Sequence, residues 1–313
     1  MTELTQALKG RDFTSIRAWS RADLEAVLDL ADELKSTRAE RRQTDLLPGR
    51  AVGLIFQKPS TRTRVSFEVG VSELGGSALH LTDDLQLGRG EPLRDTAYVL
   101  SRYLDAIMIR TFAQTDVDEL AEHASIPVVN GLTDEEHPCQ ALADLMAMRE
   151  RFGGLDGLRV TYVGDGNNVC VSLMQACSRF GVRFVAATPG DYQPPGHEVA
   201  EAQEEAARSG GSVEVVPEAA DAVAGAQVLY TDVWTSMGRE AERAARLRAF
   251  GGYALTPRLV ERAAPEAIVM HCLPAHVGEE IAEEVLYGPQ SAVWDQAENR
   301  LHAQKALLAL IVP

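Results

Sequence analysis

Short apolar runs alternate with segments of helical periodicity along most of this chain of 313 residues. We expect strands in two series, first at 51–56, 106–109 and 127–130, and then at 159–163, 183–187, 213–216, 227–230 and 267–270. Strands separated by helices pair in parallel, with helices on both faces of the sheet. A chain of this length also exceeds the usual size of one hydrophobic core. The predicted fold class is therefore α/β, with two doubly wound domains, each a mostly parallel sheet flanked by helices, and an active site in the cleft between them.

The first series defines a domain over residues 1–136, which a C-terminal helix over 297–313 joins. The second series defines a domain over residues 137–296. A helix predicted over 138–151 begins with a proline, which suits the first helical turn, and is ended by a glycine pair. We expect this helix to bridge the two domains and assign it to the second.

The composition argues against several functional classes. A formal net charge of −16 opposes binding to a phosphate backbone, so we expect no nucleic acid as a partner. No apolar run reaches membrane-spanning length, and we expect no association with a membrane. The four cysteines lack Cys-x-x-Cys spacing and follow no secretory leader, which favours reduced thiols and a cytoplasmic location.

The segment after the first predicted strand carries the clearest sign of chemistry. Ser60 is a good N-cap for the helix that follows, which places Arg62 and Arg64 in its first turn. Cations are disfavoured there, because the N-terminal end of the helix dipole is positive. A bound anion would resolve the conflict, since backbone N–H groups, Ser and Thr hydroxyls and a guanidinium could all donate to one phosphate. The alternative is a capped helix with two solvated arginines.

Polar candidates follow most of the other predicted strands. They are Arg110, the segment from His137 to Gln140, Asn168, the segment from Asp232 to Met237, and the pair Cys272 and Leu273. In open α/β sheets, ligands bind at the carboxyl ends of the strands. The first half of the chain contributes cations and hydroxyls that suit a phosphate, and the second contributes an acid and an amide that suit an amino acid. The sequence therefore predicts a two-substrate enzyme.

Each candidate also has a structural alternative. Arg110 could be an exposed strand end, and His137 could cap its helix instead of donating to a carbonyl oxygen. Asn168 and Asp232 could be turn residues, and Cys272 could be a small buried hydrophobe.

Two kinds of cofactor site are rejected. Gly164-x-Gly166 invites a dinucleotide, but Val169 replaces the third glycine of that fingerprint, and the next strand lacks the ribose-binding acid. A zinc site lacks the usual ligand spacing, and two of its candidate ligands are neighbours on a strand, which would point them to opposite faces. Those candidate ligands are His137, Cys139, His271, Cys272 and His276. We expect no metal and no cofactor.

Four motifs carry a resemblance that covers nearly the whole chain. Two of them are Ser60-Thr61-Arg62-Thr63-Arg64 and His137-Pro138-Cys139-Gln140, which resemble the carbamoyl-phosphate motifs of the aspartate/ornithine carbamoyltransferase family. The other two, Asp-Val-Trp-Thr-Ser-Met-Gly from 232 and His-Cys-Leu-Pro from 271, resemble the ornithine branch of that family. The resemblance implies an enzyme of arginine metabolism that transfers the carbamoyl group of carbamoyl phosphate to the δ-amine of L-ornithine, giving L-citrulline and phosphate.

The resemblance also implies which residues form the site. For carbamoyl phosphate they are Ser60, Thr61, Arg62, Thr63, Gln86, Arg110, His137, Pro138, Cys139, Gln140, Cys272, Leu273 and Arg300. For ornithine they are Asn168, Asp232, Ser236 and Met237. The catalytic residues among them are Arg62, Arg110, His137 and Cys272. Gln86 matches a residue that, in the family, reaches into a neighbouring subunit's site, so a homotrimer or a multiple of trimers is implied.

The implied reaction needs no covalent enzyme intermediate. A δ-amine kept neutral near Cys272 and Asp232 would attack the carbonyl carbon while arginines and a histidine offset the developing charge. Closure of the loop at 234–237 would exclude water. Gln57 and Val277 stand where many relatives have Glu and Arg, which puts local ion pairs in doubt but not the reaction.

Other functions stay open at this point. N-acetylornithine or putrescine could replace ornithine as the acceptor. Aspartate would need a cation for its second carboxylate, and Asp232 argues against it. A non-catalytic partner subunit is a further alternative, although every site residue that can be matched is present.

Overall fold

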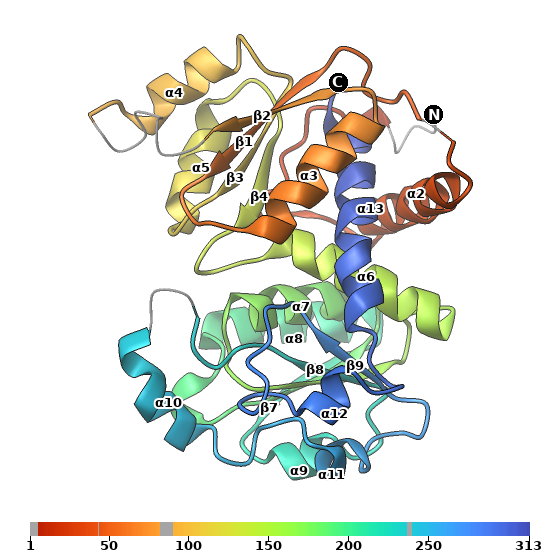
Figure 1. The fold of residues 1–313 in the computed structure, drawn as a ribbon. Helices are drawn as coiled ribbons and strands as arrows, with labels where there is room; N and C mark the ends of the chain where they lie inside the picture. The colour runs from red at the N-terminus through yellow and green to blue at the C-terminus, as the bar shows by residue number, and fades with distance from the viewer. Residues whose placement is uncertain (1–5, 43, 82–89, 237–239) are drawn as a thin grey trace. The chain divides into compact units, whose positions relative to one another are not determined.

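The computed structural model describes residues 6–42, 44–81, 90–236 and 240–313 (Figure 1). The chain divides into two compact units, Met1–Met146 with Asn299–Pro313, and Ala147–Glu298. The divisions fall inside two helices, α6 (Pro138–Phe152) and α13 (Val293–Ile311). The predicted domains, with boundaries after residues 136 and 296, are defined by the substrate that each binds. A division by compactness does not test them, and they stay predictions.

The first unit contains a parallel sheet of four strands in the order β2-β1-β3-β4. The strands are β1 (Ala51–Phe56), β2 (Ser77–Leu81), β3 (Ala106–Arg110) and β4 (Val128–Leu132). The helices are η1 (Ile16–Ala18), α2 (Arg21–Ala39), α3 (Thr61–Glu73), α4 (Leu93–Leu100), α5 (Gln114–His123) and parts of α6 and α13. The chain runs from β1 out to β2 on one side and from β3 out to β4 on the other. The strand order therefore reverses between β1 and β3.

Burial on both faces explains the composition of these strands. β1 reads Ala-Val-Gly-Leu-Ile-Phe, and every residue after the first is buried. Near-continuous apolar runs of this kind are typical of parallel strands that helices cover on both sides. On one face of the sheet, Ile55 and Ile107 share a core with Ala97 of α4 and with Val117 and Leu120 of α5. Helix α3 lies on the opposite side of the sheet (Figure 1).

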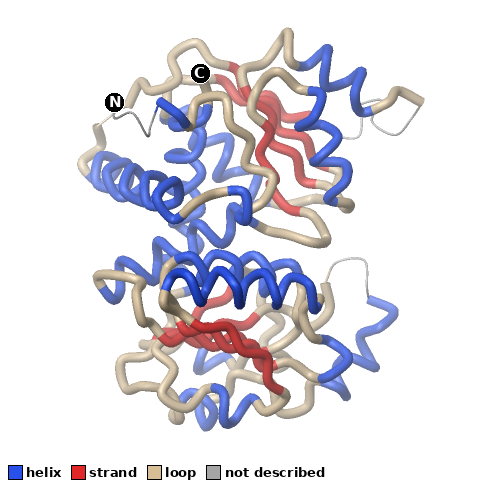
Figure 2. Tube along the Cα trace, turned by 180° about the vertical axis from the view of Figure 1, so that it is seen from behind, coloured by secondary structure: helices blue, strands red, loops and turns tan. Residues whose placement is uncertain are grey.

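The second unit contains a parallel sheet of five strands in the order β7-β6-β5-β8-β9. The strands are β5 (Arg159–Val163), β6 (Arg183–Ala187), β7 (Ser212–Val216), β8 (Val228–Thr231) and β9 (Ile268–His271). The helices are α7 (Asn168–Arg179), η2 (Gly190–Tyr192), α8 (Gly196–Ser209), α9 (Ala219–Ala222), η3 (Glu240–Glu242), α10 (Arg243–Ala249), α11 (Pro257–Val260) and α12 (Glu283–Leu286). Helices α7 and α8 cover one face of the sheet, and α9, α11 and α12 cover the other (Figures 1 and 2). Here the strand order reverses between β5 and β8.

The predicted class, two parallel sheets flanked by helices, is confirmed. The sequence analysis does not predict β2, α10, α11 or α12. Strand β2 lies at the edge of its sheet and each of its residues is at least partly exposed, so it lacks the apolar composition of a central strand. Helices α11 and α12 have four residues each, too few for a helical period to show. None of the helices in the described part of the chain combines the length and the apolar character that crossing a bilayer requires.

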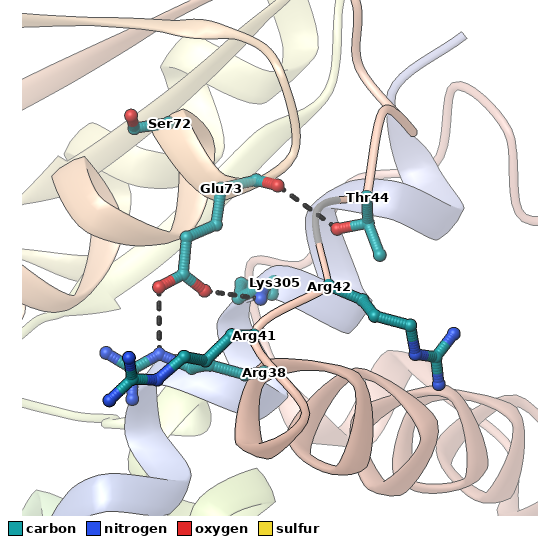
Figure 3. Close-up of a pocket in the computed structure, with 7 residues that line it drawn as sticks. All are labelled: Arg38, Arg41, Arg42, Thr44, Ser72, Glu73 and Lys305. Carbon is teal, nitrogen blue, oxygen red and sulfur yellow. Dashed lines mark hydrogen bonds and ion pairs between the residues drawn. The ribbon is translucent and has the colours of Figure 1, made fainter.

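Glu73, at the end of α3, ties three helices of the first unit together. Its carboxylate accepts a hydrogen bond from Nε of Arg38 on α2 at 2.8 Å and one from Nζ of Lys305 on α13 at 2.6 Å (Figure 3). Lys305 is 2% exposed, so its ammonium group depends on this partner. The three side chains line a pocket of about 530 Å³ that Arg41 and Arg42 also line. Glu73 is thus the counter-charge of a basic cluster.

We predict that Glu73→Gln lowers the free energy of unfolding by about 1–3 kcal/mol, because Lys305 would keep its charge in a buried position without a counter-charge. Burial by itself raises the pKa of Glu73, but the hydrogen bonds from Lys305 and Arg38 outweigh it and hold the pKa below its usual value. The stabilisation is therefore complete above the unfolded pKa of about 4.3 and is lost as the pH falls through the folded value. The difference in the free energy of unfolding between the wild type and Glu73→Gln, measured by urea unfolding, should therefore become smaller as the pH is lowered from 7 to 3.

Glu68→Gln, on the same helix, is the matched control. The ion pair of Glu68 with Nε of Arg64, at 2.9 Å, joins two side chains that are about one third and one half exposed. Its loss should change the free energy of unfolding by no more than about 0.5 kcal/mol. Equal losses in the two variants would contradict the role assigned to Glu73.

Candidate active site

The strand order of the first sheet reverses between β1 and β3, and polar residues gather at the carboxyl ends of these two strands. Phe56 and Arg110 are partners in the strand register, and the backbone N–H of Gln57 donates to the carbonyl of Arg110 at 2.9 Å. The side chain of Gln57 accepts a hydrogen bond from the Thr111 hydroxyl. This pairing brings the loop after β1 next to the end of β3. Ligands bind at such reversal points in open α/β sheets.

The predicted N-cap of α3 is confirmed. The Ser60 hydroxyl accepts a hydrogen bond from the backbone N–H of Thr63 at 3.2 Å. Thr61 and Arg62, in the first turn, are exposed, whereas Thr63 is 1% exposed. The Thr63 hydroxyl lies 3.4 Å from Nη1 of Arg110, which is almost completely buried. The arginine at the end of β3 is therefore no exposed strand end, and that structural alternative falls.

Arg300 connects α13 to this cluster. Its Nη2 donates to the Thr63 hydroxyl at 3.2 Å and its Nη1 donates to Oε1 of Gln140 at 2.8 Å. Gln140 in turn donates from Nε2 to Oδ1 of Asp144 at 2.8 Å. Arg300, Gln140 and Asp144 are almost completely buried. Residues from α3, β3, α6 and α13 thus form one hydrogen-bonded group, in which the sequence analysis had not singled out Asp144.

His137 is held at the start of α6 and is 5% exposed. Burial lowers the pKa of its imidazole well below the usual value, and the positive charges of Arg300, Arg110 and Arg62 lower it further. The imidazole is therefore neutral near pH 7. Three guanidinium groups that act on one buried imidazole also create a region of positive potential, inside a chain whose net charge is −16. Such a region suits a small anion.

Pro138 and Cys139 follow His137 in the first turn of α6. Pro138 begins the helix, as predicted. The Cys139 thiol is completely buried and donates to the backbone carbonyl of Asn130 at 3.3 Å. Burial raises the pKa of this thiol to about 12. Cys139 therefore stays protonated, and its side chain packs against β4.

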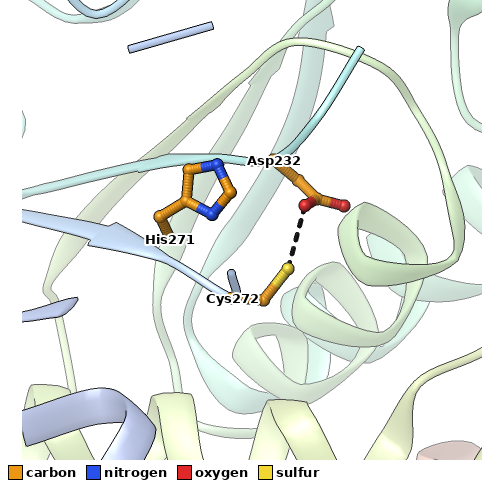
Figure 4. Close-up of side chains that lie close together, drawn as sticks. All are labelled: Asp232, His271 and Cys272. Carbon is orange, nitrogen blue, oxygen red and sulfur yellow. Dashed lines mark hydrogen bonds between the residues drawn. The ribbon is translucent and has the colours of Figure 1, made fainter. Parts of the chain in front are cut away.

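In the second unit, the candidates follow β5, β8 and β9, and the strand order reverses between β5 and β8. Thr231 and His271 are partners in the register of β8 and β9, so the next residues, Asp232 and Cys272, emerge side by side. Asp232 is 4% exposed. The Cys272 thiol donates to Oδ1 of Asp232 at 2.9 Å (Figure 4). This arrangement places an acid and a thiol together, as the sequence suggested for an amine.

Asn167, which the sequence analysis missed, holds the other oxygen of this acid. Its Nδ2 donates to Oδ2 of Asp232 at 2.7 Å, while its Oδ1 accepts from the backbone N–H groups of Val169 and Cys170 as the N-cap of α7. The predicted residue, Asn168, is the first residue of α7 and is half-buried. An asparagine directly before a helix was the available signal for Asn167.

The segment that follows Asp232 is held by Arg246 of α10, a second residue that sequence reasoning missed. Its Nη1 donates to the backbone carbonyl of Trp234 at 2.8 Å and to Oδ2 of Asp165 at 2.7 Å. Its Nε donates to Glu242 at 2.9 Å. Arg246 thereby joins the loops after β5 and β8.

Of the remaining predicted ligands, Ser236 is half-buried, and Gln86 and Met237 lie outside the described residues.

Gly166 has a structural explanation that is unrelated to a dinucleotide. A Cβ atom at this position would lie 2.2 Å from the backbone nitrogen of Pro194, and the N–H of Gly166 donates to the carbonyl of Tyr192 at 2.8 Å. The glycine thus allows two backbone segments to approach closely.

One argument against a zinc site is wrong. Ligand atoms of Asp232, His271 and Cys272 lie within 4.8 Å of one another (Figure 4). His271 and Cys272 do not point to opposite faces, because β9 ends at His271 and strand alternation stops there. Both ring nitrogens of His271 are nevertheless engaged, with Leu273 and Glu280. A second group of potential ligands is His276, Glu279 and Glu280. The expectation of no metal stays a prediction.

Two family models match the chain. The carbamoyl-P binding domain of aspartate/ornithine carbamoyltransferase matches residues 11–150, and the Asp/Orn binding domain matches residues 156–311. A relative from Symbiobacterium thermophilum named ornithine carbamoyltransferase is 60% identical over 306 residues, which cover 97% of this chain and 99% of the relative. One of the same name from Pyrococcus horikoshii is 50% identical over 307 residues, 98% of this chain and 97% of the relative.

Solved structures extend the similarity to the fold. The ornithine carbamoyltransferase from Pyrococcus furiosus superimposes with a TM-score of 0.95 at 50% identity, covering 97% of this chain and 98% of that one. An N-acetyl-L-ornithine transcarbamylase superimposes with a TM-score of 0.87 at 30% identity, covering 96% of this chain and 100% of that one. The chain is thus more similar in sequence to the first protein than to the second.

We predict that the His137 imidazole remains neutral as the pH falls through about 6.5, the ordinary value for histidine. Its pKa is lowered by burial and by Arg300, Arg110 and Arg62. The unfolded chain takes up this proton and the folded chain does not, so His137 contributes stability above pH 6.5 that is lost as the pH falls. NMR titration of the histidine side chains, with His137→Gln to assign the signal, is the measurement. A midpoint at or above 6.5 would contradict the prediction.

Proposed function

We propose that this chain, which belongs to the aspartate/ornithine carbamoyltransferase family, transfers the carbamoyl group of carbamoyl phosphate to the δ-amine of L-ornithine. The products are L-citrulline and phosphate, and the reaction belongs to arginine metabolism. The observation that carries the proposal is 50–60% identity, over nearly the whole chain, to relatives named ornithine carbamoyltransferase.

In this proposal the phosphate of carbamoyl phosphate binds at the N-terminus of α3. Backbone N–H groups there point out of the helix, and the hydroxyls of Ser60, Thr61 and Thr63 lie in the same turn. The guanidinium groups of Arg62 and Arg110 supply charge-assisted hydrogen bonds. The positive potential around His137 supports this assignment, because a bound anion would offset the repulsion among the positive charges of Arg62, Arg110 and Arg300.

The carbamoyl group would be held by the start of α6. A neutral imidazole can donate a hydrogen bond to the carbonyl oxygen, which gains negative charge when the carbon is attacked. We assign this role to His137, with Gln140 oriented beside it by Arg300. Pro138 and Cys139 would contribute through the helix turn they form, since the Cys139 thiol is turned toward Asn130. Cys272 and Leu273 are further proposed ligands of carbamoyl phosphate.

Ornithine would be bound by the second unit. A carboxylate, two asparagines and a thiol gather at the point where the strand order reverses, and they suit an amino acid's charged groups. We assign Asn168, Asp232, Ser236 and Met237 to ornithine. Asn167 and Cys272 hold Asp232 in a fixed orientation, which keeps its negative charge in place for the amine.

The chemical step follows from these assignments. The neutral δ-amine attacks the carbonyl carbon, a carbon–nitrogen bond forms, and the carbon–oxygen bond to phosphate breaks. The nitrogen loses one proton, which the departing phosphate takes up. Alignment of the two substrates removes much of the entropic barrier, and Arg62, Arg110 and His137 offset charge on the carbonyl oxygen and the leaving phosphate. The proposal also includes a homotrimer or a multiple of trimers, with Gln86 reaching a neighbouring subunit, and a cytoplasmic location.

The reaction is tested by incubating the protein with carbamoyl phosphate and, in parallel, with ornithine, N-acetylornithine, putrescine or aspartate. We expect citrulline and phosphate with ornithine and little product with the other acceptors. Preference for another amine would overturn the ornithine assignment while keeping carbamoyl transfer. No product with any acceptor, together with binding of carbamoyl phosphate, would favour a partner subunit.

We predict that Arg62→Ala lowers kcat/KM for carbamoyl phosphate by at least about 100-fold, because a charge-assisted contact that strengthens in the transition state is lost. Arg64→Ala is the matched control. Arg64 lies in the same helix turn, is about half exposed and pairs with Glu68, so its loss should leave kcat/KM near the wild-type value. Similar kinetics for Arg62→Ala and the wild type would refute the assignment of Arg62.

A further inference from the structure

A histidine and a glutamate that the proposed reaction does not use are buried beside the segment that follows β9. His271, the last residue of β9, is 1% exposed, and Glu280 is 0% exposed. The imidazole Nε2 lies 3.1 Å from Oε1 of Glu280, and Nδ1 accepts a hydrogen bond from the backbone N–H of Leu273 at 2.9 Å. A backbone N–H can only donate, so Nδ1 carries no proton and Nε2–H donates to Glu280. These contacts fix one tautomer of the imidazole.

Leu273 has an unusual backbone conformation. Its φ is +58°, in the left-handed region, where the Cβ atom crowds the following carbonyl. A residue stays in such a conformation only when its surroundings hold it there, and such residues cluster at functional sites. The hydrogen bond from the Leu273 N–H to the His271 side chain, two residues earlier, is a local contact that holds it.

Glu280 fixes the far end of the same segment. Its Oε1 also accepts a hydrogen bond from the backbone N–H of His276 at 2.5 Å. The near end is fixed as well, because the N–H of His271 donates to Oε1 of Gln296 at 2.9 Å. One buried carboxyl group thus connects to residues 271 and 276, on either side of Cys272 and Leu273.

The contribution of the Glu280 carboxyl group to the free energy of unfolding does not by itself explain its presence. Its second oxygen, Oε2, is buried and has no hydrogen-bond partner among the described residues. An unsatisfied buried polar atom lowers the free energy of unfolding, and well-packed apolar residues often serve stability better than buried charged ones. The arrangement is explained more simply by the backbone geometry that it imposes on residues 272 and 273.

We infer that His271 and Glu280 are positioning residues that set the backbone of Leu273 and the thiol of Cys272 for substrate binding. The inference rests on the proposed function, in which these two residues bind carbamoyl phosphate. His271 fixes the N–H of Leu273, and Glu280 fixes the tautomer of His271. Cys272 is the first residue of the segment that these contacts hold, and its thiol also donates a hydrogen bond to Asp232 at 2.9 Å.

Two substitutions of His271 separate positioning from general structural support. The oxygen of an asparagine side chain lies near the position of Nδ1, whereas a glutamine side chain reaches the position of Nε2. His271→Asn therefore keeps an acceptor for the Leu273 N–H and loses the donor to Glu280, and His271→Gln does the reverse. His271→Asn removes the imidazole donor to Glu280 and leaves the backbone N–H of His276 as the other donor to Oε1. Because this variant could fail to fold, the double variant with Glu280→Gln also replaces the buried carboxyl group with an amide.

We expect His271→Gln to fold, to lose protection of the Leu273 amide in hydrogen–deuterium exchange, and to lower kcat/KM for carbamoyl phosphate by about 10–100-fold. The asparagine variant, alone or with Glu280→Gln, should keep both properties close to the wild type. Glu279→Gln is the matched control, since this neighbouring carboxylate pairs with Arg243 and lies 4.0 Å from Nδ1 of His276, and no hydrogen bond or ion pair joins it to His271 among the described residues. In the Glu279→Gln variant, the exchange rate of the Leu273 amide should equal that of the wild type.

The outcomes are distinguishable from failure of the proposed function. A folded His271→Gln protein with wild-type exchange at Leu273 and wild-type kinetics overturns the inference, as does equal loss of activity in both His271 variants at equal stability. If the wild-type protein transfers no carbamoyl group to any acceptor, the proposed function fails. Exchange at the Leu273 amide would then still test whether the His271 and Glu280 pair sets this backbone.

Discussion

Each parallel sheet of this chain is covered by helices on both faces, and this constraint decides where polar chemistry can occur. Strands buried on both sides are mostly apolar along their length, so charged groups emerge mainly where a strand ends. The points at which strand order reverses leave room for a ligand. The loop after β1 with Arg110 occupies one such point, and Asp232 with the loop after β5 occupies the other. Two chemically different sites thus arise from one rule.

Buried charge is costly, and the two units offset that cost differently. In the first, Arg110 and Arg300 share the Thr63 hydroxyl, and Arg300 also donates to the amide oxygen of Gln140. The histidine beside them is kept neutral. In the second, a thiol and an asparagine amide, both uncharged, surround Asp232. These hydrogen bonds to neutral groups orient the guanidinium groups of Arg110 and Arg300 and the carboxylate of Asp232. Such pre-oriented charges need no rearrangement when a ligand of opposite charge arrives.

What could be predicted from sequence follows from the range of the interactions. The Ser60 cap, the strand before it and the positions of Asp232 and Cys272 directly after strands depend on local periodicity, and they could be predicted from the sequence. Asn167, Arg246 and Glu280 act on residues 65, 12 and 9 positions away, through contacts that only packing creates. The edge strand β2 was missed because its exposed residues do not need to be apolar. The misjudged orientation of His271 and Cys272 came from extending strand alternation past the end of β9.

The overall charge and the local charge of this protein have opposite signs, and distance decides which one a ligand meets. At physiological ionic strength, exposed charges are screened beyond about 8 Å, so most of the net charge of −16 is weak at any one site. Buried groups are screened much less. Arg110 and Arg300 are 8% and 3% exposed, and their charges act on His137 and lower the pKa of its imidazole further than burial alone. An acidic chain can in this way offer a site for an anion, because the burial that makes a charge costly also preserves its field.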